Sequence, residues 1–312
     1  MVSGDLQACG WTACGWTACG WKAAEISARS GLSTALFEDR RLGAREIARL
    51  GETGIKHVEL GVLPLDLGAL PRSVDHRDAR QMSEIKRACE ENDVRIVSLH
   101  SPNLDYGACD EELRLGAVRE GLFVARLAAE MGARALVNHF RADDQTRKSI
   151  HELLDGIADL PLVLGAENLT DENSIQRILS LVEAFDSDQL GMVLDIGHET
   201  GADGVNPFTA AGRARDAVVQ CGGRLVHVHL HETLAHSYEP VAAGCPSPRR
   251  RDHQPPLHED GIIQWGEVFQ GLHDIGYAGM LIFEDGLCDV PWSFVEATIA
   301  FPGEFVRRYR PA

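Results

Sequence analysis

The sequence predicts a protein of the α/β class, a single (β/α)8 barrel with an extended loop after strand seven. Short apolar or β-branched runs alternate eight times with longer stretches whose apolar residues recur at three- and four-residue spacing. Glycine follows several helical stretches, at Gly51, Gly132 and Gly276, where a left-handed cap is expected. Eight such alternations predict eight parallel strands, each followed by a helix, closed into a barrel.

The predicted elements are short and follow one another at regular spacing. The strands are Ala24–Ala28, Lys56–Leu60, Arg95–His100, Arg134–His139, Leu162–Glu167, Met192–Asp195, Leu225–Leu230 and Met280–Glu284. The helices are Ala44–Leu50, Asp78–Glu91, Glu111–Met131, Thr146–Ile157, Ser174–Phe185, Pro207–Val219, Trp265–Ile275 and Ser293–Arg308. A doubly wound open sheet is the alternative fold. It normally carries a Gly-rich phosphate-binding turn after its first strand, and Ser30-Gly31-Leu32-Ser33 is not one.

Residues 1–22 lie outside the predicted barrel, which we place at residues 23–312. Ala8 to Lys22 repeat Ala-Cys-Gly-Trp-Thr almost without change, and a five-residue period matches neither a strand nor a helix. The repeat places cysteines at Cys9, Cys14 and Cys19, which could chelate a soft metal. We expect a disordered extension or a reading-frame artefact instead, and leave the role of the repeat open.

The composition is that of an ordinary globular protein with a formal net charge of −17. This acidity argues against a broad nucleic-acid footprint. The chain shows no run near the roughly 20 apolar residues of a membrane span, and no signal-peptide pattern. Its eight cysteines form no Cys-x-x-Cys pair, which suits reduced thiols. We therefore expect a cytoplasmic protein with a small-molecule partner and no membrane partner. Assembly into a homo-oligomer stays open.

The predicted seventh strand carries three histidines at alternate positions, His227, His229 and His231. Alternate side chains of a strand share one face, so the imidazoles lie together opposite the aliphatic residues. Three imidazoles are costly to bury without partners, and metal binding or catalysis is the usual reason to tolerate them. We expect His227 to be a hydrogen-bonded core residue and His231 to lie on a solvated loop. His229, where the strand ends, is the functional candidate.

Ionisable residues also stand at the carboxyl ends of the other predicted strands. The last inward-facing residues of strands two to eight are Glu59, His100, His139, Glu167, Asp195, His229 and Glu284. Side chains at these ends converge on the catalytic face of a barrel. A single acidic residue after a strand is usually solvated or a helix cap, but seven at matched positions are not explained that way.

Crowded carboxylates require either strongly raised pKa values or a cation, and a divalent metal is the simpler solution. The most oxygen-rich subset consists of Glu167, Asp195, His229 and Glu284. Three carboxylates with one imidazole favour Mn²⁺, with Mg²⁺ or Co²⁺ as alternatives. Coordination by His100 and His139 as well would favour Zn²⁺ or a multinuclear cluster.

Several short motifs stand in a fixed order between Ala24 and the C-terminus. They are Gly54-Ile-Lys-His-Val-Glu-Leu-Gly61, Ser98-Leu-His-Ser-Pro102, Ala166-Glu-Asn-Leu169, Leu194-Asp-Ile-Gly-His198, His227-Val-His-Leu-His-Glu232, Gly261-Ile-Ile-Gln-Trp265, and Gly276-Tyr-Ala-Gly279 leading into Ile282-Phe-Glu284. Together they resemble the xylose isomerase-like TIM barrel superfamily, which includes sugar isomerases, epimerases and endonuclease IV. The resemblance implies that Glu167, Asp195, His229 and Glu284 hold one divalent metal. It also implies that the two glutamates act as acid and base in epimerase members.

Two positions depart from the pattern of that superfamily. Gln264 stands where its members often have an acid before the tryptophan. Asp252 and His253 are adjacent, whereas endonuclease IV-like members have an Asp-x-His pair that holds a third metal. The second departure argues against a trinuclear site.

The leading hypothesis is a divalent-metal-dependent isomerase or epimerase of a small keto-sugar or polyol. One of Glu167 and Glu284 would remove the proton next to a metal-bound carbonyl, and the other would return one. The residues expected to bind substrate are Glu59, His100, His139, His198 and Trp265. A related dehydratase or lyase that uses the same first proton abstraction is a close alternative.

Two hypotheses from other classes stay open. An endonuclease IV-like metal-dependent phosphodiesterase is favoured by His100, His139 and His198 and disfavoured by the net charge. A metal-binding barrel without catalysis is the third. The long segment from Glu232 to Gly261, rich in Pro, Arg and His, follows a strand, so we expect it to cover the site.

Overall fold

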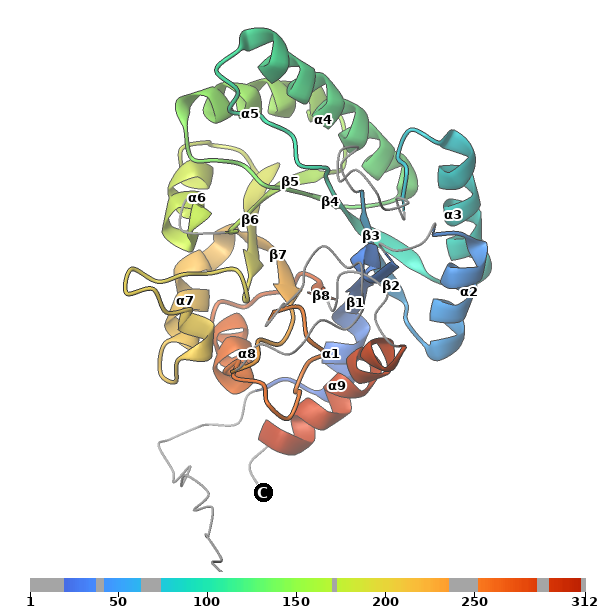
Figure 1. Ribbon diagram of the computed structural model, residues 1–312, viewed down its shortest axis with the longest axis vertical. Coiled ribbons are helices and arrows are strands. Elements are labelled where there is room, and N and C mark those ends of the chain that lie inside the picture. The colour runs from blue at the N-terminus through green and yellow to red at the C-terminus, as the bar shows by residue number, and fades with distance from the viewer. Residues whose placement is uncertain are drawn as a thin grey trace, which may run out of the picture.

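The computed structural model describes residues 20–37, 42–62, 74–169, 173–235, 252–284 and 292–309. Within these ranges, parallel strands β1 to β8 form one closed barrel in sequence order, and β8 pairs with β1. The helices surround the barrel, so the strands occupy the centre of the molecule (Figure 1). The predicted (β/α)8 barrel is confirmed.

The strands are β1 (Ser30–Ser33), β2 (His57–Gly61), β3 (Arg95–His100), β4 (Ala135–Asn138), β5 (Val163–Glu167), β6 (Leu190–Asp195), β7 (Leu225–Leu230) and β8 (Leu281–Phe283). The α-helices are α1 (Ala23–Arg29), α2 (Ala44–Thr53), α3 (Ala79–Glu91), α4 (Glu111–Met131), α5 (Asp144–Ile157), α6 (Ile175–Glu183), α7 (Ala214–Cys221), α8 (Trp265–Asp274) and α9 (Ser293–Tyr309). Helix α1 precedes β1. Helices α2 to α9 then follow β1 to β8 in turn, one helix after each strand.

The first strand lies later in the chain than the sequence predicted. Residues Ala24–Ala28 belong to α1, and β1 begins at Ser30. Strand β1 has small residues because the space beside it is filled: a Cβ at Gly31 would lie 2.7 Å from Ile282 Cδ1 and 3.0 Å from the His57 carbonyl oxygen. Close packing therefore excludes the apolar run by which the other strands were recognised.

Two helix ends also differ from the prediction. Helix α2 continues through Gly51 to Thr53. Its C-terminal cap is Gly54, which has a φ of 97° and therefore adopts the left-handed conformation. The predicted helix Pro207–Val219 is split into a short 3-10 helix at Pro207–Thr209 and α7. Gly212, with a φ of 83°, lies between the two pieces and explains the break.

The packed chain begins before residue 23, contrary to the predicted boundary. Trp21 is 6% exposed, donates a hydrogen bond from Nε1 to the Phe269 carbonyl oxygen at 2.9 Å, and packs edge-on against the Phe269 ring. Arg29 lies over the Trp21 ring and bonds the carbonyl oxygens of Tyr277 and Gly279. Gly20–Lys22 therefore belong to the folded unit; the copies of the repeat before them lie outside the described residues.

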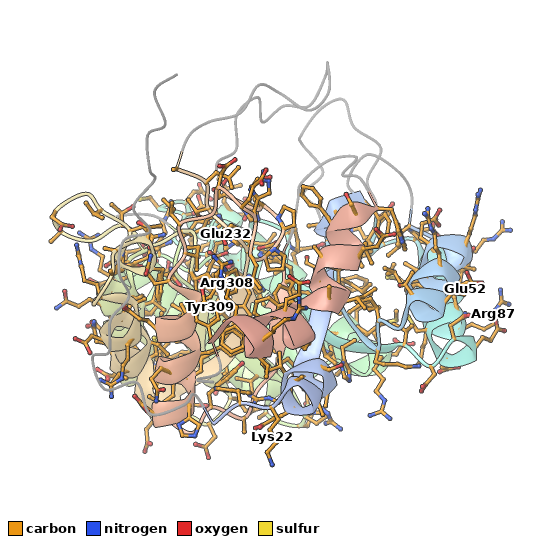
Figure 2. The ribbon with its side chains drawn as sticks, turned by 90° about the horizontal axis from the view of Figure 1, so that it is seen from below. Lys22, Glu52, Arg87, Glu232, Arg308 and Tyr309 are labelled. Carbon is orange, nitrogen blue, oxygen red and sulfur yellow. The ribbon has the colours of Figure 1, made fainter. Side chains whose placement is uncertain are left out.

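The described ends of the segment that follows β7 lie together. Glu232 and Gln254 form an antiparallel bridge, as do Leu234 and Gly261, so both ends are held on the carboxyl-end side of the barrel. Figure 2 shows the barrel from the side, with Lys22 near its lower edge and Glu232 toward the opposite edge. The extended loop predicted after strand seven is present, and residues 236–251 within it lie outside the described residues. Among the described helices, none has the length and apolar character required to cross a membrane.

We predict that Trp21→Ala lowers the free energy of unfolding by about 3–5 kcal/mol, because it removes a buried aromatic side chain. Trp21→Phe keeps most of the packing and loses the Nε1 hydrogen bond, so it should cost about 1 kcal/mol. Urea denaturation of both variants measures the difference. Equal stability of Trp21→Ala and the unmodified chain would place residue 21 outside the folded unit after all.

Candidate functional site

The carboxyl ends of β5 to β8 bring four ligand-type side chains together. Glu167 ends β5, Asp195 ends β6, His229 lies near the end of β7, and Glu284 directly follows β8. One nitrogen or oxygen atom of each lies within 4.8 Å of the others, and none of the four residues is more than 7% exposed. These are the residues that the sequence predicted as metal ligands, and we call them the central cluster.

His229 lies at the middle of the central cluster. Its Nδ1 is 2.7 Å from Glu167 Oε1 and 3.4 Å from Glu284 Oε2, while its Nε2 forms a hydrogen bond with Glu59 Oε2 at 3.3 Å. Donation from Nε2–H to Glu59 leaves Nδ1 as the nitrogen that faces the other carboxylates. A carboxylate behind a histidine is the usual arrangement that fixes the tautomer of a metal-binding imidazole.

Glu59 supports His229 and does not face the mouth of the barrel. Its carboxylate is fully buried, accepts a hydrogen bond from Ser98 Oγ at 2.8 Å, and lies 3.1 Å from His227 Nε2. Among the described residues, the hydrogen-bond partners of this carboxylate all belong to the barrel interior. Glu59 is withdrawn as a substrate-binding residue, while His227 is the hydrogen-bonded core histidine that the sequence predicted.

Asp195 has one satisfied and one unsatisfied carboxylate oxygen. Oδ1 accepts hydrogen bonds from the backbone N–H groups of Gly197 and His198 at 2.7 and 2.9 Å, and lies 3.1 Å from His231 Nε2. Oδ2 is buried, yet no described residue forms a hydrogen bond with it. His198 Nδ1 lies 3.3 Å from Oδ2 without forming a hydrogen bond to it. A buried carboxylate oxygen with no hydrogen bond, beside two further carboxylates and an imidazole nitrogen, fits a divalent cation.

Asn168 positions Asp195, and the sequence analysis did not single it out. Its Oδ1 accepts the Asp195 backbone N–H at 2.9 Å and its Nδ2 donates to the Asp195 carbonyl oxygen at 2.8 Å. The amide thus continues the pairing of β5 with β6 by one residue beyond the strands. The signal in the sequence is its place directly after Glu167, within the motif Ala166-Glu-Asn-Leu169.

His100 and His139 contact the second oxygen of Glu167. Their Nε2 atoms lie 3.3 and 2.9 Å from Glu167 Oε2, and both side chains are partly exposed. His139 Nδ1 is held 2.6 Å from Asn103 Oδ1. Together with Glu167 these two imidazoles form a second group of metal-ligand type beside the central cluster.

The two glutamates of the central cluster differ in proton affinity. Burial raises the pKa of Glu284, and the neighbouring His229 and His100 imidazoles offset this in part. Burial also opposes ionisation of Glu167, but His229, followed by His100 and His139, holds the pKa of Glu167 well below its usual range. Two nearby carboxyl groups whose environments push their pKa values apart are typical of acid/base pairs.

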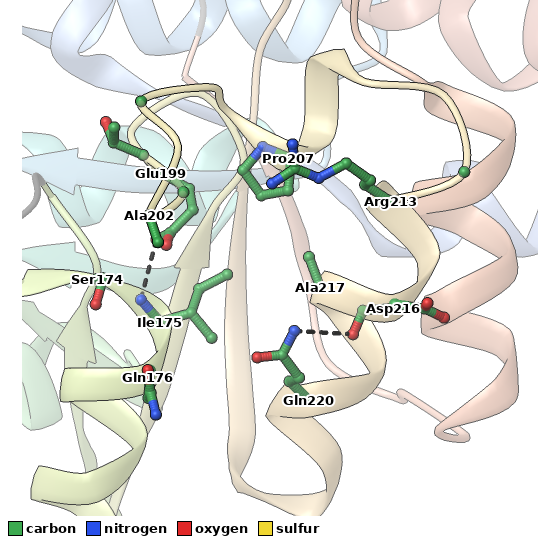
Figure 3. Close-up of a pocket in the computed structure, with 14 residues that line it drawn as sticks. Ser174, Ile175, Gln176, Glu199, Ala202, Pro207, Arg213, Asp216, Ala217 and Gln220 are labelled. Atoms are coloured by element: carbon green, nitrogen blue, oxygen red, sulfur yellow. Dashed lines mark hydrogen bonds between the residues drawn. The ribbon is translucent and has the colours of Figure 1, made fainter.

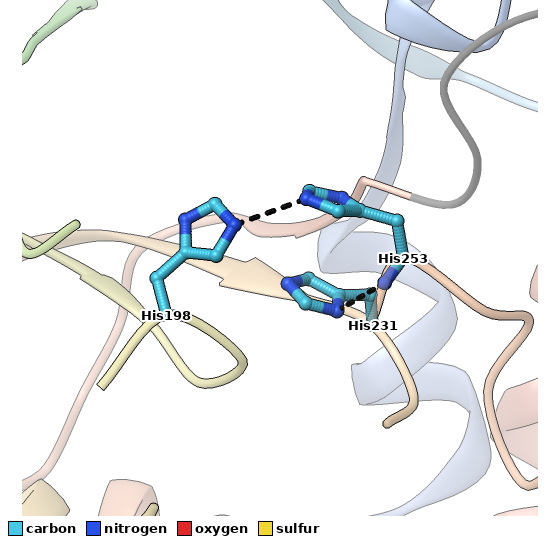
Figure 4. Close-up of side chains that lie close together, drawn as sticks. All are labelled: His198, His231 and His253. Carbon is cyan, nitrogen blue, oxygen red and sulfur yellow. Dashed lines mark hydrogen bonds between the residues drawn. The ribbon is translucent and has the colours of Figure 1, made fainter. Parts of the chain in front are cut away.

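Three histidines lie beyond the central cluster, where the segment after β7 returns to the barrel (Figure 4). His198 Nε2 and His253 Nε2 are 3.0 Å apart, and the His231 and His253 rings stack with centroids 4.1 Å apart. His231 is fully buried, so the predicted position on a solvated loop is wrong. The His253 backbone N–H donates to His231 Nδ1 at 2.8 Å, which leaves His231 Nε2–H to donate to Asp195. Both nitrogens of His231 are thus used within the protein, and it orients Asp195.

Asp252 and His253 lie closer to the site than their adjacency in the sequence suggested. His253 Nδ1 is 2.8 Å from the Glu284 carbonyl oxygen, and Asp252 Oδ2 is 3.9 Å from His198 Nε2. His253 has a φ of 54°, an unusual left-handed conformation for histidine, and its side chain points toward His198. Both residues of this adjacent pair therefore lie beside His198, although the prediction that they form no third-metal site stays a prediction.

Trp265 is not brought to the site. It is 1% exposed, its Nε1 donates to Glu232 Oε2 at 2.6 Å, and its ring packs against Phe301 of α9. The tryptophan is a core residue between barrel and helices, and it is withdrawn as a substrate-binding residue. Its partner Glu232 also accepts the Ile263 backbone N–H at 2.8 Å and so anchors the end of the inserted segment.

A pocket of about 720 Å³ lies between the start of α6 and α7, with Ser174, Glu199, Arg213 and Asp216 among its lining residues (Figure 3). None of its lining residues belongs to the central cluster. The Glu199 carboxylate is turned to the backbone and accepts the Ile175 N–H at 3.0 Å. The volume of a pocket is therefore not what identifies the candidate catalytic site in this molecule.

Comparison with known proteins agrees with this architecture. A family model described as xylose isomerase-like TIM barrel matches residues 47–287. An uncharacterized protein of Methanocaldococcus jannaschii is 24% identical over 147 residues, which cover 46% of this chain and 43% of that protein. The chain thus matches less than half the length of this curated relative.

Solved structures cover nearly the whole chain. A D-tagatose 3-epimerase-like protein superposes with a TM-score of 0.65 at 18% identity, covering 90% of this chain and 96% of that one. D-psicose 3-epimerase from Clostridium cellulolyticum, with D-tagatose, gives 0.63 at 15% identity and covers 90% and 99%. The IolI protein with a bound zinc atom gives 0.64 at 15% identity and covers 91% and 100%. At these identities the likeness shows the fold.

We predict that Asp195→Asn abolishes binding of a divalent metal while the barrel stays folded. An asparagine Oδ1 can still accept the N–H groups of Gly197 and His198, so the loop is kept, but the second oxygen becomes an amide nitrogen. Metal content after purification without chelator, measured beside the circular dichroism spectrum, checks this. A variant that retains a full equivalent of metal would contradict the assignment.

We predict that Glu59→Gln weakens metal affinity by about 10–100-fold, because residues behind a ligand histidine fix its orientation and basicity. Competition with a chromophoric chelator measures the affinity. Glu267→Gln is the matched control, since Glu267 is a buried carboxylate outside the central cluster that accepts the backbone N–H groups of Gly212 and Ala214, and its substitution should leave the affinity unchanged. An equal effect of both substitutions would reduce the role of Glu59 to general stability.

Proposed function

Because the chain belongs to the xylose isomerase-like TIM barrel family, we propose that it is a divalent-metal-dependent isomerase or epimerase of a small keto-sugar or polyol. The observation that supports this most directly is the central cluster, which gathers three buried carboxylates and one imidazole at the catalytic face of the barrel. The sugar epimerases among the structural neighbours support the same class of reaction.

Glu167, Asp195, His229 and Glu284 are the residues that would hold the metal. Their oxygen-rich set favours Mn²⁺, with Mg²⁺, Co²⁺ or Zn²⁺ as alternatives, and the zinc atom of the IolI structure supports a divalent ion in such a barrel. When bound, the metal would polarise a substrate carbonyl as a Lewis acid. His229 would coordinate through Nδ1, the nitrogen that faces the two glutamates.

Glu167 and Glu284 would move the protons of the reaction. Both carboxylates approach His229 Nδ1, at 2.7 and 3.4 Å, and they come from strands three positions apart in the ring. One carboxylate would remove the proton on the carbon next to the carbonyl, and the other, as a carboxylic acid, would return a proton. Delivery to the opposite face of that carbon gives an epimer.

His100, His139 and His198 would bind the hydroxyl groups of the substrate. Their side chains are 16–19% exposed, whereas His229 and Asp195 are fully buried, so these imidazoles form the accessible rim of the cluster. Each also contacts a cluster carboxylate, which limits its orientation. A rim of imidazoles supplies both donors and acceptors for a polyhydroxylated ligand.

An endonuclease IV-like phosphodiesterase is the second candidate, and one observation favours it. His198, Asp252 and His253 converge beside the central cluster, and His100 and His139 flank it, so that ligand-type groups for more than one metal are close together. The net charge of −17 weighs against a broad phosphate-binding surface. Incubation with a duplex that contains an abasic site distinguishes the two candidates.

We predict that Glu167→Gln and Glu284→Gln each lower the rate of C–H exchange by about 10²–10⁴-fold, because each removes a proton-transfer group and keeps a neutral oxygen. Deuterium uptake from D₂O, scored over a panel of ketoses and inososes, measures the rate, and metal content is determined for each variant. Full exchange in both metal-loaded variants would reject the proton-transfer mechanism. In that case the hydrolytic candidate takes first place.

A further inference from the structure

A second pocket adjoins the central cluster at the carboxyl ends of β3, β4 and β5. Its volume is about 330 Å³, and His139 forms part of its wall. The same histidine contacts Glu167 through Nε2 at 2.9 Å and Asn103, another lining residue, through Nδ1 at 2.6 Å. The His139 side chain therefore stands between Glu167 and this pocket, so the pocket is one side chain away from the central cluster.

Two buried polar atoms belong to residues that line the pocket, and no described residue satisfies them. Asn173 is 5% exposed and Thr146 is fully buried, yet Asn173 Oδ1 and Thr146 Oγ1 form no hydrogen bond with any part of the chain that the structure describes. Buried polar atoms are normally paired, so an unpaired acceptor and an unpaired hydroxyl in one pocket point to a ligand with hydroxyl groups.

The pocket floor is narrow at Gly107. A Cβ there would lie 2.6 Å from Arg141 Nη2 and 2.9 Å from Thr146 Oγ1, so polar atoms of the pocket approach the bare backbone. Leu104 and Leu169 supply apolar lining. Apolar walls with a few converging polar groups are typical of small-molecule sites, which measure roughly 300–1,000 Å³. The volume here suits one ring-sized group.

The charges of the pocket favour a neutral ligand over an anion. Arg141 is its guanidinium, and it pairs with Asp105 at 2.6 Å and with Asp143 at 3.3 Å. Of these three residues Arg141 and Asp105 line the pocket, and their charges cancel, so the described lining offers no unpaired guanidinium or ammonium group to hold a phosphate or carboxylate. The amides of Asn103 and Asn173 and the hydroxyls of Tyr106 and Thr146 remain, and these polar groups match neutral hydroxyl groups.

We propose that this pocket binds a second, neutral sugar ring linked to the sugar that reacts, so that the substrate is a keto-glycoside and not a free monosaccharide. The proposal rests on the proposed function, which places the reacting carbon at Glu167. The reacting unit contacts the central cluster and the imidazole rim. The second ring lies past His139, with hydroxyl groups on Asn173 Oδ1 and Thr146 Oγ1.

Binding of unreactive sugars to the full-length, metal-loaded protein tests the pocket without any reaction. Glucose, maltose and cellobiose are titrated by saturation-transfer NMR, so that both α- and β-linked second rings are tried. At least one disaccharide should bind about tenfold more tightly than glucose. Equal affinity for all three sugars overturns the proposal, as does displacement of the disaccharide by inorganic phosphate at equal concentration.

Two shape-conserving variants locate the second ring. Thr146→Val and Asn173→Leu should each weaken disaccharide binding by about 3–10-fold, the value of one hydrogen bond, and leave glucose binding unchanged. Thr53→Val, whose hydroxyl bonds the Leu50 carbonyl oxygen on α2, is the matched control and should change neither. Equal losses for glucose and disaccharide, or none in either pocket variant, contradict the pocket assignment.

Deuterium exchange separates failure of the pocket from failure of the proposed function. A ketohexose and a keto-disaccharide are compared in D₂O with the unmodified protein and Thr146→Val. Faster exchange of the keto-disaccharide, reduced by Thr146→Val, supports both ideas. Exchange of both sugars at one rate, unaffected by Thr146→Val, overturns the pocket alone. Absence of exchange together with an intact disaccharide preference overturns the proposed reaction alone.

Discussion

The charge balance at the mouth of the barrel is the constraint on which the rest of the site depends. Glu167, Asp195 and Glu284 are buried within 4.8 Å of one another, and Glu59 is buried against the other nitrogen of His229. Carboxylates so placed are stable only if cations or imidazoles compensate them. Burial lowers the pKa of an imidazole, but Glu59 and Glu167 hold the pKa of His229 well above its usual value. Protons on imidazoles can therefore supply the positive charge that a divalent metal would supply when bound, and a metal must displace the proton on Nδ1 to bind there.

The sequence predicted the barrel and the residues of the central cluster because both follow from periodicity. Strand side chains alternate, and the carboxyl ends of parallel strands converge. Counting residues along each strand was therefore enough to predict that Glu167, Asp195 and Glu284 lie close together. The boundaries of α4 and β7 were also found without error. Tertiary packing decided the rest: β1 has small residues because Ile282 and His57 fill the space beside it, and no pattern in a short window reports that.

The residues that were misjudged depend on contacts between distant segments. His231 was expected in solvent because it follows the last strand residue. The segment near residue 253 instead returns to the barrel and buries it. Trp265 was expected at the substrate because of its motif, but Glu232, 33 positions earlier, takes its indole N–H into the core. Asn168 was passed over because an amide beside a glutamate has no pattern of its own. In each case the deciding partner is far away in the sequence, or is the backbone itself.

The alternating histidines of β7 acquire a common explanation from the structure. His227 lies deepest and contacts Glu59, His229 lies between Glu59 and Glu167, and His231 lies outermost and contacts Asp195. One strand therefore supplies an imidazole at three successive depths, each matched to a carboxylate from another strand. The outermost one also accepts the His253 N–H, so the end of the inserted segment is joined to the same row. Asp195, a candidate metal ligand, is consequently held by the same histidine that holds the inserted segment. Movement of that segment away from the barrel would remove the N–H that fixes His231 and would weaken one of the three hydrogen bonds on Asp195 Oδ1, while those from Gly197 and His198 remain.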